Sequence, residues 1–361
     1  MVVPGSMRIW IQLTTVALAL AAAFVPIAGG TIERQFSTSL YPGIQRVVTS
    51  ASNLAPFALF DLLIVVAAVL MVVVVVRAVR AARHECRVRP IATAIGGIAT
   101  TAAMVYLVFL GVWGLNYRRL PMAERLVIGD VRPDTEAVVS LGLDVAGRLN
   151  ALHESAHRIG WLVEPRDNRT LLDAYARVQQ RLSDAPPAVP GRLKATLFGP
   201  YFRWTSVDGM VNPFALEVLA NPDLLPFERP FVAAHEWAHL AGYANESEAS
   251  FVGWLTCVQA DVPAQYSAWL FLFWQISGEL PASDRTPLWE ALADGPRRDL
   301  EAIAERLRTG QLPLLRRASW AVYDGYLRAN RVDEGIRSYG EVISLILRAR
   351  FDEGWNPVRR E

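Results

Sequence analysis

Cysteine and lysine are scarce in this chain of 361 residues. The two cysteines, Cys86 and Cys257, lie far apart, so we expect neither a disulfide nor a cysteine-based metal site. Lys194 is the single lysine, and the formal net charge is only +1. Because nucleic-acid-binding surfaces are strongly basic, we expect no nucleic-acid partner.

Long hydrophobic runs are abundant near the N-terminus. Three runs, at about 9–28, 56–76 and 91–115, are long enough to span a bilayer. The first run could pass for a signal peptide, but the two further spans favour a retained anchor. An arginine-rich segment joins the second and third runs, whereas 29–55 holds only two arginines. The positive-inside rule therefore predicts a multi-pass plasma-membrane protein in which the chain after Leu115 lies outside the cytoplasm.

The motif that carries chemistry is HEWAH at 235–239, an H-E-x-x-H run. Histidines four residues apart project from one face of a helix, so both can bind one zinc ion. Glu236 is then placed to take a proton from a water molecule that the metal activates. Apart from these three residues no acidic or basic side chain of the Asp, Glu, His, Lys or Arg type occurs in 231–244. This predicts a helix that is buried nearly all round and stops near Gly242.

A catalytic zinc site needs a third protein ligand, and the candidates are Glu246 and Glu248. On a helical wheel Glu248 falls on the apolar face, among Phe251, Val252 and Leu255. Glu246 falls on the opposite face, with Ala249, Ser250, Gly253 and Cys257. A buried carboxylate needs a charge partner, so we predict Glu248 as the third ligand. The alternative is a capping box formed by Asn245 and Glu248 at the helix start.

An H-E-x-x-H motif followed by a glutamate on the next helix resembles the gluzincin branch of zinc metallopeptidases. More closely, 235–255 resembles an uncharacterised bacterial membrane family, domain of unknown function 3810, with the approximate pattern HE-x-AH-x-x-GFA-x-E-x-EANF. Ser250 stands where that pattern has asparagine. Further similarity lies in Asn212-Pro213-Phe214 with Glu217, in GVWGLNYRR around Asn116, and in Arg337-Ser338-Tyr339. The resemblance implies a location in the bacterial inner (plasma) membrane with the soluble part facing the periplasm or the cell exterior.

A second H-E-x-x-H run, HESAH, occupies 153–157. It lies within 135–160, whose periodicity predicts an amphipathic helix with a charged outer face. His153 and His157 fall at the edge of the apolar stripe, and no glutamate follows on a buried helical face. We therefore interpret them as ordinary surface or boundary histidines. A zinc ion shared between the two motifs is the remaining alternative.

The predicted fold class is mainly α (α+β), with a membrane region at 1–115 and an extracytoplasmic, zincin-like, mostly helical domain at 116–361. Helices are expected at 135–160, 170–183 and 266–276, one helix or a pair at 284–309, and a pair at 314–350 around Gly335. Short strands are expected within 192–225, including 196–198 and 210–219. The stretch from Met210 to Leu216 is predicted either to bind a substrate backbone beside the zinc helix or simply to pack.

The function predicted from the sequence is that of a membrane-anchored zinc metallopeptidase, an endopeptidase acting on a peptide or protein substrate. Zn²⁺ would be held by His235, His239 and Glu248, with Glu236 as general base. Gluzincin-like enzymes stabilise the oxyanion with a tyrosine, histidine or arginine from a later part of the chain, and this makes Tyr339 and Arg337 the candidates here. The alternative is a non-catalytic zinc-binding membrane sensor or scaffold.

Overall fold

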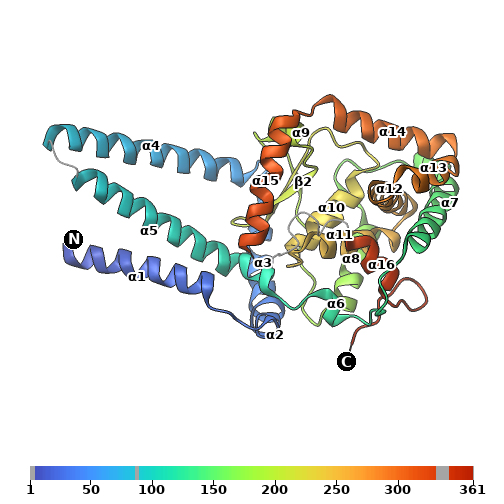
Figure 1. Cartoon of the computed structure of the whole chain (residues 1–361), viewed down its shortest axis with the longest axis horizontal. Coiled ribbons are helices and arrows are strands. Elements are labelled where there is room, and N and C mark those ends of the chain that lie inside the picture. The colour runs from blue at the N-terminus through green and yellow to red at the C-terminus, as the bar shows by residue number, and fades with distance from the viewer. Residues whose placement is uncertain (1–4, 86–88, 331–340, 361) are drawn as a thin grey trace.

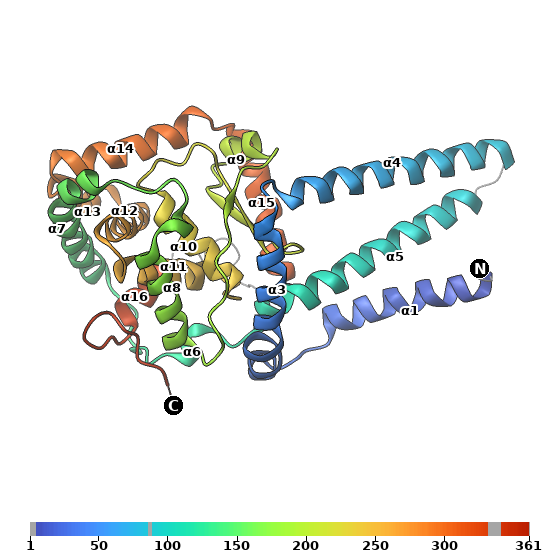
Figure 2. The same cartoon turned by 180° about the vertical axis from the view of Figure 1, so that it is seen from behind.

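Three long helices project from one side of a helical body (Figures 1 and 2). The structure, a computed structural model, describes residues 5–85, 89–330 and 341–360. The N-terminal part contains α1 (Gly5–Phe24), α2 (Gly29–Ile32), the π-helix η1 (Glu33–Leu40), α3 (Tyr41–Leu54), α4 (Leu59–Glu85) and α5 (Arg89–Val112). The projecting helices are α1, α4 and α5, while α3 lies against the body.

Two of the projecting helices qualify as membrane spans by length and hydropathy, at Leu59–Ala81 and Thr93–Val112. They confirm the second and third predicted spans. The first predicted span, at about 9–28, passes the same test only together with the chain that follows it. Ile9–Phe24 and Gly29–Leu54 then form a pair of helices with a bend of 114° between them. The described residues therefore hold two to three candidate spans, which indicate a membrane protein. The start of α1 and the far ends of α4 and α5 lie together, away from the body (Figure 1).

The body is mainly helical, as predicted. Its central helices are α10, α11 and α12, which are apolar on almost every face and therefore buried, whereas amphipathic helices such as α7, α8 and α14 cover them. The elements are η2 (Gly114–Arg118), α6 (Met122–Arg125), α7 (Thr135–Ile159), η3 (Pro165–Asp167), α8 (Arg169–Leu182), α9 (Gly199–Thr205), α10 (Arg229–Leu240), α11 (Glu246–Val258), α12 (Val262–Glu279), α13 (Ala282–Glu290), α14 (Asp294–Thr309), α15 (Pro313–Ala329) and α16 (Glu341–Arg348).

A small sheet of three strands lies in the body, in the order β1 (Leu193–Lys194), β3 (Glu217–Ala220), β2 (Gly209–Asn212). β1 runs parallel to β3, and β2 runs antiparallel to it. The predicted strand 210–219 is thus a hairpin, turned through Leu216 at a φ of 43°. The predicted strand at 196–198 is wrong. The Thr196 hydroxyl and the Leu197 amide donate hydrogen bonds to the Asp61 carboxylate in the first turn of α4, and no ladder forms there.

The only lysine of the chain joins this sheet to the membrane helices. Lys194 donates hydrogen bonds to Glu217 at 2.7 Å and to the carbonyl of Ser52 at 2.8 Å, all within the interior. The Glu217 carboxylate also accepts the backbone N–H groups of Leu59 and Phe60 at 3.0 and 2.7 Å, and thereby caps the start of α4. Burial raises the pKa of Glu217, but these donors outweigh it and hold the pKa below its usual range.

Lys194→Met should destabilise the protein by roughly 3–5 kcal/mol, because it leaves a carboxylate buried without its partner. Because the folded-state pKa of Glu217 is lowered, its stabilisation is present above the unfolded-state pKa of about 4.3 and is lost as the pH falls through the folded value. Denaturant unfolding in detergent, from pH 7 down to pH 3, measures both effects.

A double-mutant cycle with Glu217→Gln tests whether the two side chains interact directly. The double variant should lose much less unfolding free energy than the sum of the losses in the two single variants. Additive losses would contradict a direct pair, and Asp184→Asn, at an exposed ion pair, is the control.

Candidate metal centre

The H-E-x-x-H helix and the helix after it form a tight pair at the centre of the body. Pro230 lies in the first turn of α10, and Gly242, at a φ of 84°, reverses the chain after it. The Asn245 side chain then caps α11 by accepting the amides of Ser247 and Glu248 at 2.9 and 3.3 Å. This turn brings the start of α11 back to the face of α10 that carries both histidines.

Three ligand atoms converge where the two helices meet. The Nε2 atoms of His235 and His239 lie 3.2 Å apart, and Oε2 of Glu246 lies 3.3 and 3.4 Å from them. A tetrahedral zinc ion with bonds of about 2.0–2.1 Å places its ligand atoms ~3.3–3.4 Å apart. The triangle of His235, His239 and Glu246 thus has the size of one face of such a site, and it could hold a metal ion.

The protonation of His239 shows why this cluster needs a cation. Its Nδ1 lies 2.8 Å from the Tyr243 carbonyl, which only accepts, so Nδ1 carries a hydrogen and the neutral ring turns the Nε2 lone pair toward Glu246. Burial lowers the pKa of His239, but the Glu246 carboxylate outweighs it and raises the pKa to about 9. Burial likewise raises the pKa of Glu246, yet both imidazoles hold it well below its ordinary value. A proton or a metal ion must therefore lie between these groups.

The structure does not bring Glu248, the predicted third ligand, to the two histidines. Oε1 of Glu248 accepts the Met122 amide at 2.5 Å, and Oε2 lies 3.6 Å from the guanidinium of Arg125. The capping alternative is half right, because Asn245 caps the helix but the Glu248 carboxylate serves the start of α6 instead. Every residue of α11 from Glu246 to Cys257 is buried, so the helix has no outward face to which Glu246 could be assigned.

The position of Glu246 follows from a close approach of α11 to α10. A Cβ on Gly253 would lie 2.9 Å from the backbone nitrogen of His235, so only glycine fits without a shift. One turn earlier, the Ser250 hydroxyl lies 3.3 Å from Nδ1 of His235. The face that the wheel set aside, with Glu246, Ser250 and Gly253, is therefore the face that packs on the histidines.

Glu236 lies beside the cluster, against strand β2. Gly209 provides the space, since a Cβ there would fall 2.5 Å from Oε1 of Glu236. The side chain is buried, and Oε2 has no hydrogen-bond partner among the residues that the structure describes. Burial raises the pKa of Glu236, the two histidines lower it, and the net direction is upward. A buried carboxylate oxygen without a partner is costly for stability, so its presence here needs an explanation.

The carbonyl end of α10 is held by side chains from other parts of the chain. A helix leaves its last carbonyls without partners, and here four of the carbonyls at or just beyond that end receive donors. The carbonyl of Trp237 accepts a hydrogen bond from Tyr175 (2.5 Å), that of His239 from Trp113 (3.0 Å), that of Leu240 from Tyr41 (2.8 Å) and that of Gly242 from Arg119 (2.9 Å). These bonds fix the orientation of the helix that carries the histidines.

A tyrosine that the sequence did not single out completes the surroundings of Glu246. The Tyr323 hydroxyl of α15 donates a hydrogen bond to Oε1 of Glu246 and leaves Oε2 to face the imidazoles. Such outer partners orient a metal-binding carboxylate. No pattern in the sequence links Tyr323 to Glu246, which lies 77 residues earlier. The predicted oxyanion residues, Tyr339 and Arg337, lie outside the described residues.

The chain matches the family described as "Protein of unknown function (DUF3810)" over residues 36–347. It belongs to this family. No curated protein and no solved structure matches it. What this DUF3810 protein offers chemically thus rests on its own geometry, which is a His-His-Glu cluster beside a buried glutamate.

Glu246→Gln should abolish metal binding at this centre, because the amide removes the charge that holds the ion. Glu248→Gln should retain the metal, since Glu248 faces Met122 and Arg125. Zinc content per chain, measured on purified protein after equilibration with Zn²⁺, distinguishes the two variants. Loss of zinc in Glu248→Gln, with zinc retained in Glu246→Gln, would instead identify Glu248 as the ligand.

Gly253→Ala should push α11 away from α10, with a cost of about 1–3 kcal/mol from overpacking. Because Glu246 moves with α11, zinc affinity should also fall. Gly278→Ala in α12 is the matched control, since a Cβ there meets nothing within 4 Å and the change should be neutral or slightly stabilising. Thermal unfolding and zinc affinity of both variants check this, and an unchanged Gly253→Ala protein would refute the close approach.

Proposed function

We propose that this DUF3810 protein is a membrane-anchored, zinc-dependent metallopeptidase that hydrolyses peptide bonds. The observation that carries the proposal is the triangle of His235, His239 and Glu246, with the Glu236 carboxylate buried beside it. In this proposal Glu246, not Glu248, is the acidic ligand. The resemblance to zincin-type enzymes rests on this set of groups.

The residues present suit zinc. Two imidazole nitrogens and one carboxylate oxygen are the donor set of many catalytic zinc sites, and the separations of 3.2–3.4 Å match such a site. Zinc held there would supply a Lewis acid that polarises a carbonyl oxygen and makes water acidic enough to lose a proton near neutral pH.

Glu236 would move the proton in this reaction. Its Oε2 has no partner among the described residues, so it is able to accept a proton from water and later return it to the leaving amine. The upward direction of its pKa favours such exchange near neutral pH. Gly209 leaves the space that this carboxylate occupies.

The edge of strand β2 is our candidate for the substrate-binding strand. β2 pairs with β3 on one side and has no ladder partner on the other within the described part of the chain. Its first residue, Gly209, abuts Glu236, so a peptide added along this edge would pass close to the general base. The strand begins one residue before the predicted stretch and ends at Asn212.

The membrane arrangement suggests on which side the enzyme works. The arginine-rich end of α4 points away from the body, and arginine-rich ends favour the cytoplasm (Figure 1). The body would then face the periplasm or the cell exterior, joined to the bacterial inner membrane by up to three spans. Peptides or proteins on that side are the expected substrates.

One observation favours the alternative of a non-catalytic zinc-binding sensor or scaffold. The side chains of His235, His239 and Glu246 are only 15, 9 and 7 % exposed. Structural zinc sites are closed, whereas catalytic sites keep a position open to substrate. Metal binding without turnover would therefore favour the scaffold.

Glu236→Gln should keep the zinc content of the wild type and lose about 100- to 10,000-fold of the hydrolytic rate, the usual contribution of a general base. Cleavage of a peptide library by the full-length protein in detergent measures this. Glu154→Gln is the matched control, because Glu154 occupies the same place in the second H-E-x-x-H run but is exposed and paired with Arg158. Undiminished cleavage by Glu236→Gln would remove the base assignment, and no cleavage by wild type with zinc bound would favour the scaffold.

A further inference from the structure

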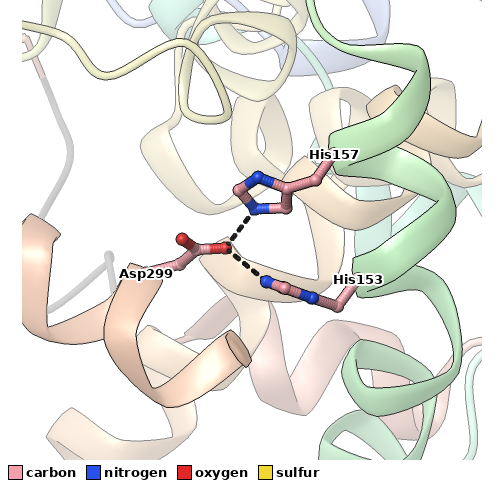
Figure 3. Close-up of side chains that lie close together, drawn as sticks. All are labelled: His153, His157 and Asp299. Atoms are coloured by element: carbon pink, nitrogen blue, oxygen red, sulfur yellow. Dashed lines mark hydrogen bonds and ion pairs between the residues drawn. The ribbon is translucent and has the colours of Figure 1, made fainter. Parts of the chain in front are cut away.

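The second H-E-x-x-H run lies on α7, and its histidines meet an acid from a distant helix. The rings of His153 and His157 lie side by side, with centroids 4.3 Å apart. Both face Asp299 of α14, as Figure 3 shows. In the sequence no glutamate follows these histidines on a buried helical face, whereas the fold supplies an aspartate that lies 142 residues after His157.

One oxygen of Asp299 is the centre of this cluster. Oδ2 lies 2.7 Å from Nε2 of His157 and 3.6 Å from Nε2 of His153, and it accepts a hydrogen bond from the Tyr266 hydroxyl at 2.6 Å. The Asp299 side chain is 11 % exposed, but those of His153 and His157 are 24 and 38 % exposed. The anion is thus held inside by Tyr266, while the imidazoles are open to solvent from which an ion can enter.

A glycine on α14 shows that this arrangement depends on close packing. A Cβ on Gly295 would lie within 2.4–2.6 Å of three atoms of the His153 ring. Gly295 lies one turn before Asp299, so the approach that needs glycine also brings the carboxylate to the imidazoles. Ordinary surface histidines need no such fit.

We propose that His153, His157 and Asp299 form a second metal site, one that takes a divalent transition-metal ion of the zinc class. It shares no ligand with the first centre. Imidazole and carboxylate are ligands that such ions accept, and Tyr266 is the positioning residue that orients the carboxylate.

Entry of the ion replaces the hydrogen bond between His157 and Asp299. Their 2.7 Å separation must widen by roughly 0.6 Å to reach the spacing of tetrahedral ligands. The proton of that bond passes to Nδ1 when the His157 ring is neutral, and leaves to solvent when the ring is charged. The required widening and the exposure make this the weaker, exchangeable site, and a bound ion would join α7 to α14.

Zinc titration of the full-length, chelator-stripped protein in detergent tests the proposal. The wild type should bind two Zn²⁺ per chain, and the weaker equivalent should be lost in His157→Ala and in Asp299→Asn. His239→Ala should lose the tighter equivalent and keep the weaker one. Asp299→Asn keeps an acceptor for Tyr266 and His157, so it separates loss of the metal from loss of folding.

Two results would overturn the second site. One is a wild type that binds a single Zn²⁺ per chain at saturation. The other is a second equivalent that survives both His157→Ala and Asp299→Asn. His84→Ala changes the one histidine of the chain that belongs to neither proposed site. It controls for adventitious binding and should leave both zinc equivalents in place. Because His239→Ala reports on the first centre separately, failure of the second site is distinguishable from failure of the proposed peptidase.

Discussion

Two imidazole nitrogens and a carboxylate oxygen meet in the interior of this protein at 3.2–3.4 Å, and the rest of the body holds them there. A lone pair of His239 turned toward the anion of Glu246 would be repulsive without a cation between them, so the fold is built around a positive charge. The approach of α11 at Gly253 and the hydrogen bond from Tyr323 both serve that encounter. Helix α10 is the fixed reference, since four side chains from other parts of the chain hold the carbonyls at its end.

The candidate metal centre is connected by hydrogen bonds to the chain beside the candidate membrane helices. Trp113 and Arg119, which follow α5 directly, donate to carbonyls at the end of the histidine helix. In the opposite direction, Glu217 of the sheet caps the start of α4, and Lys194 balances its charge. Helix α5 is thus followed directly by groups that hold the histidine helix, whereas α4 begins on a carboxylate of the sheet.

Local patterns predict much of this fold, but not the contacts that complete the site. Periodicity located α7, α8 and α12, and motif spacing located His235 and His239, because both depend on helix geometry alone. The wheel failed at Glu246 because it assigns large apolar residues to the core, whereas two helices approach most closely through small residues such as Gly253. Asp299 lies 142 residues after its partner His157, and Tyr323 lies 77 residues after its partner Glu246. Only the tertiary fold could reveal these two contacts.

The most direct test of the central claim is to locate the metal in crystals of the wild-type protein by anomalous scattering at the zinc edge. We predict a peak about 2.0–2.1 Å from Nε2 of His235, Nε2 of His239 and Oε2 of Glu246. No anomalous density among these three atoms in zinc-equilibrated crystals, or a peak coordinated by Glu248 in place of Glu246, would contradict it.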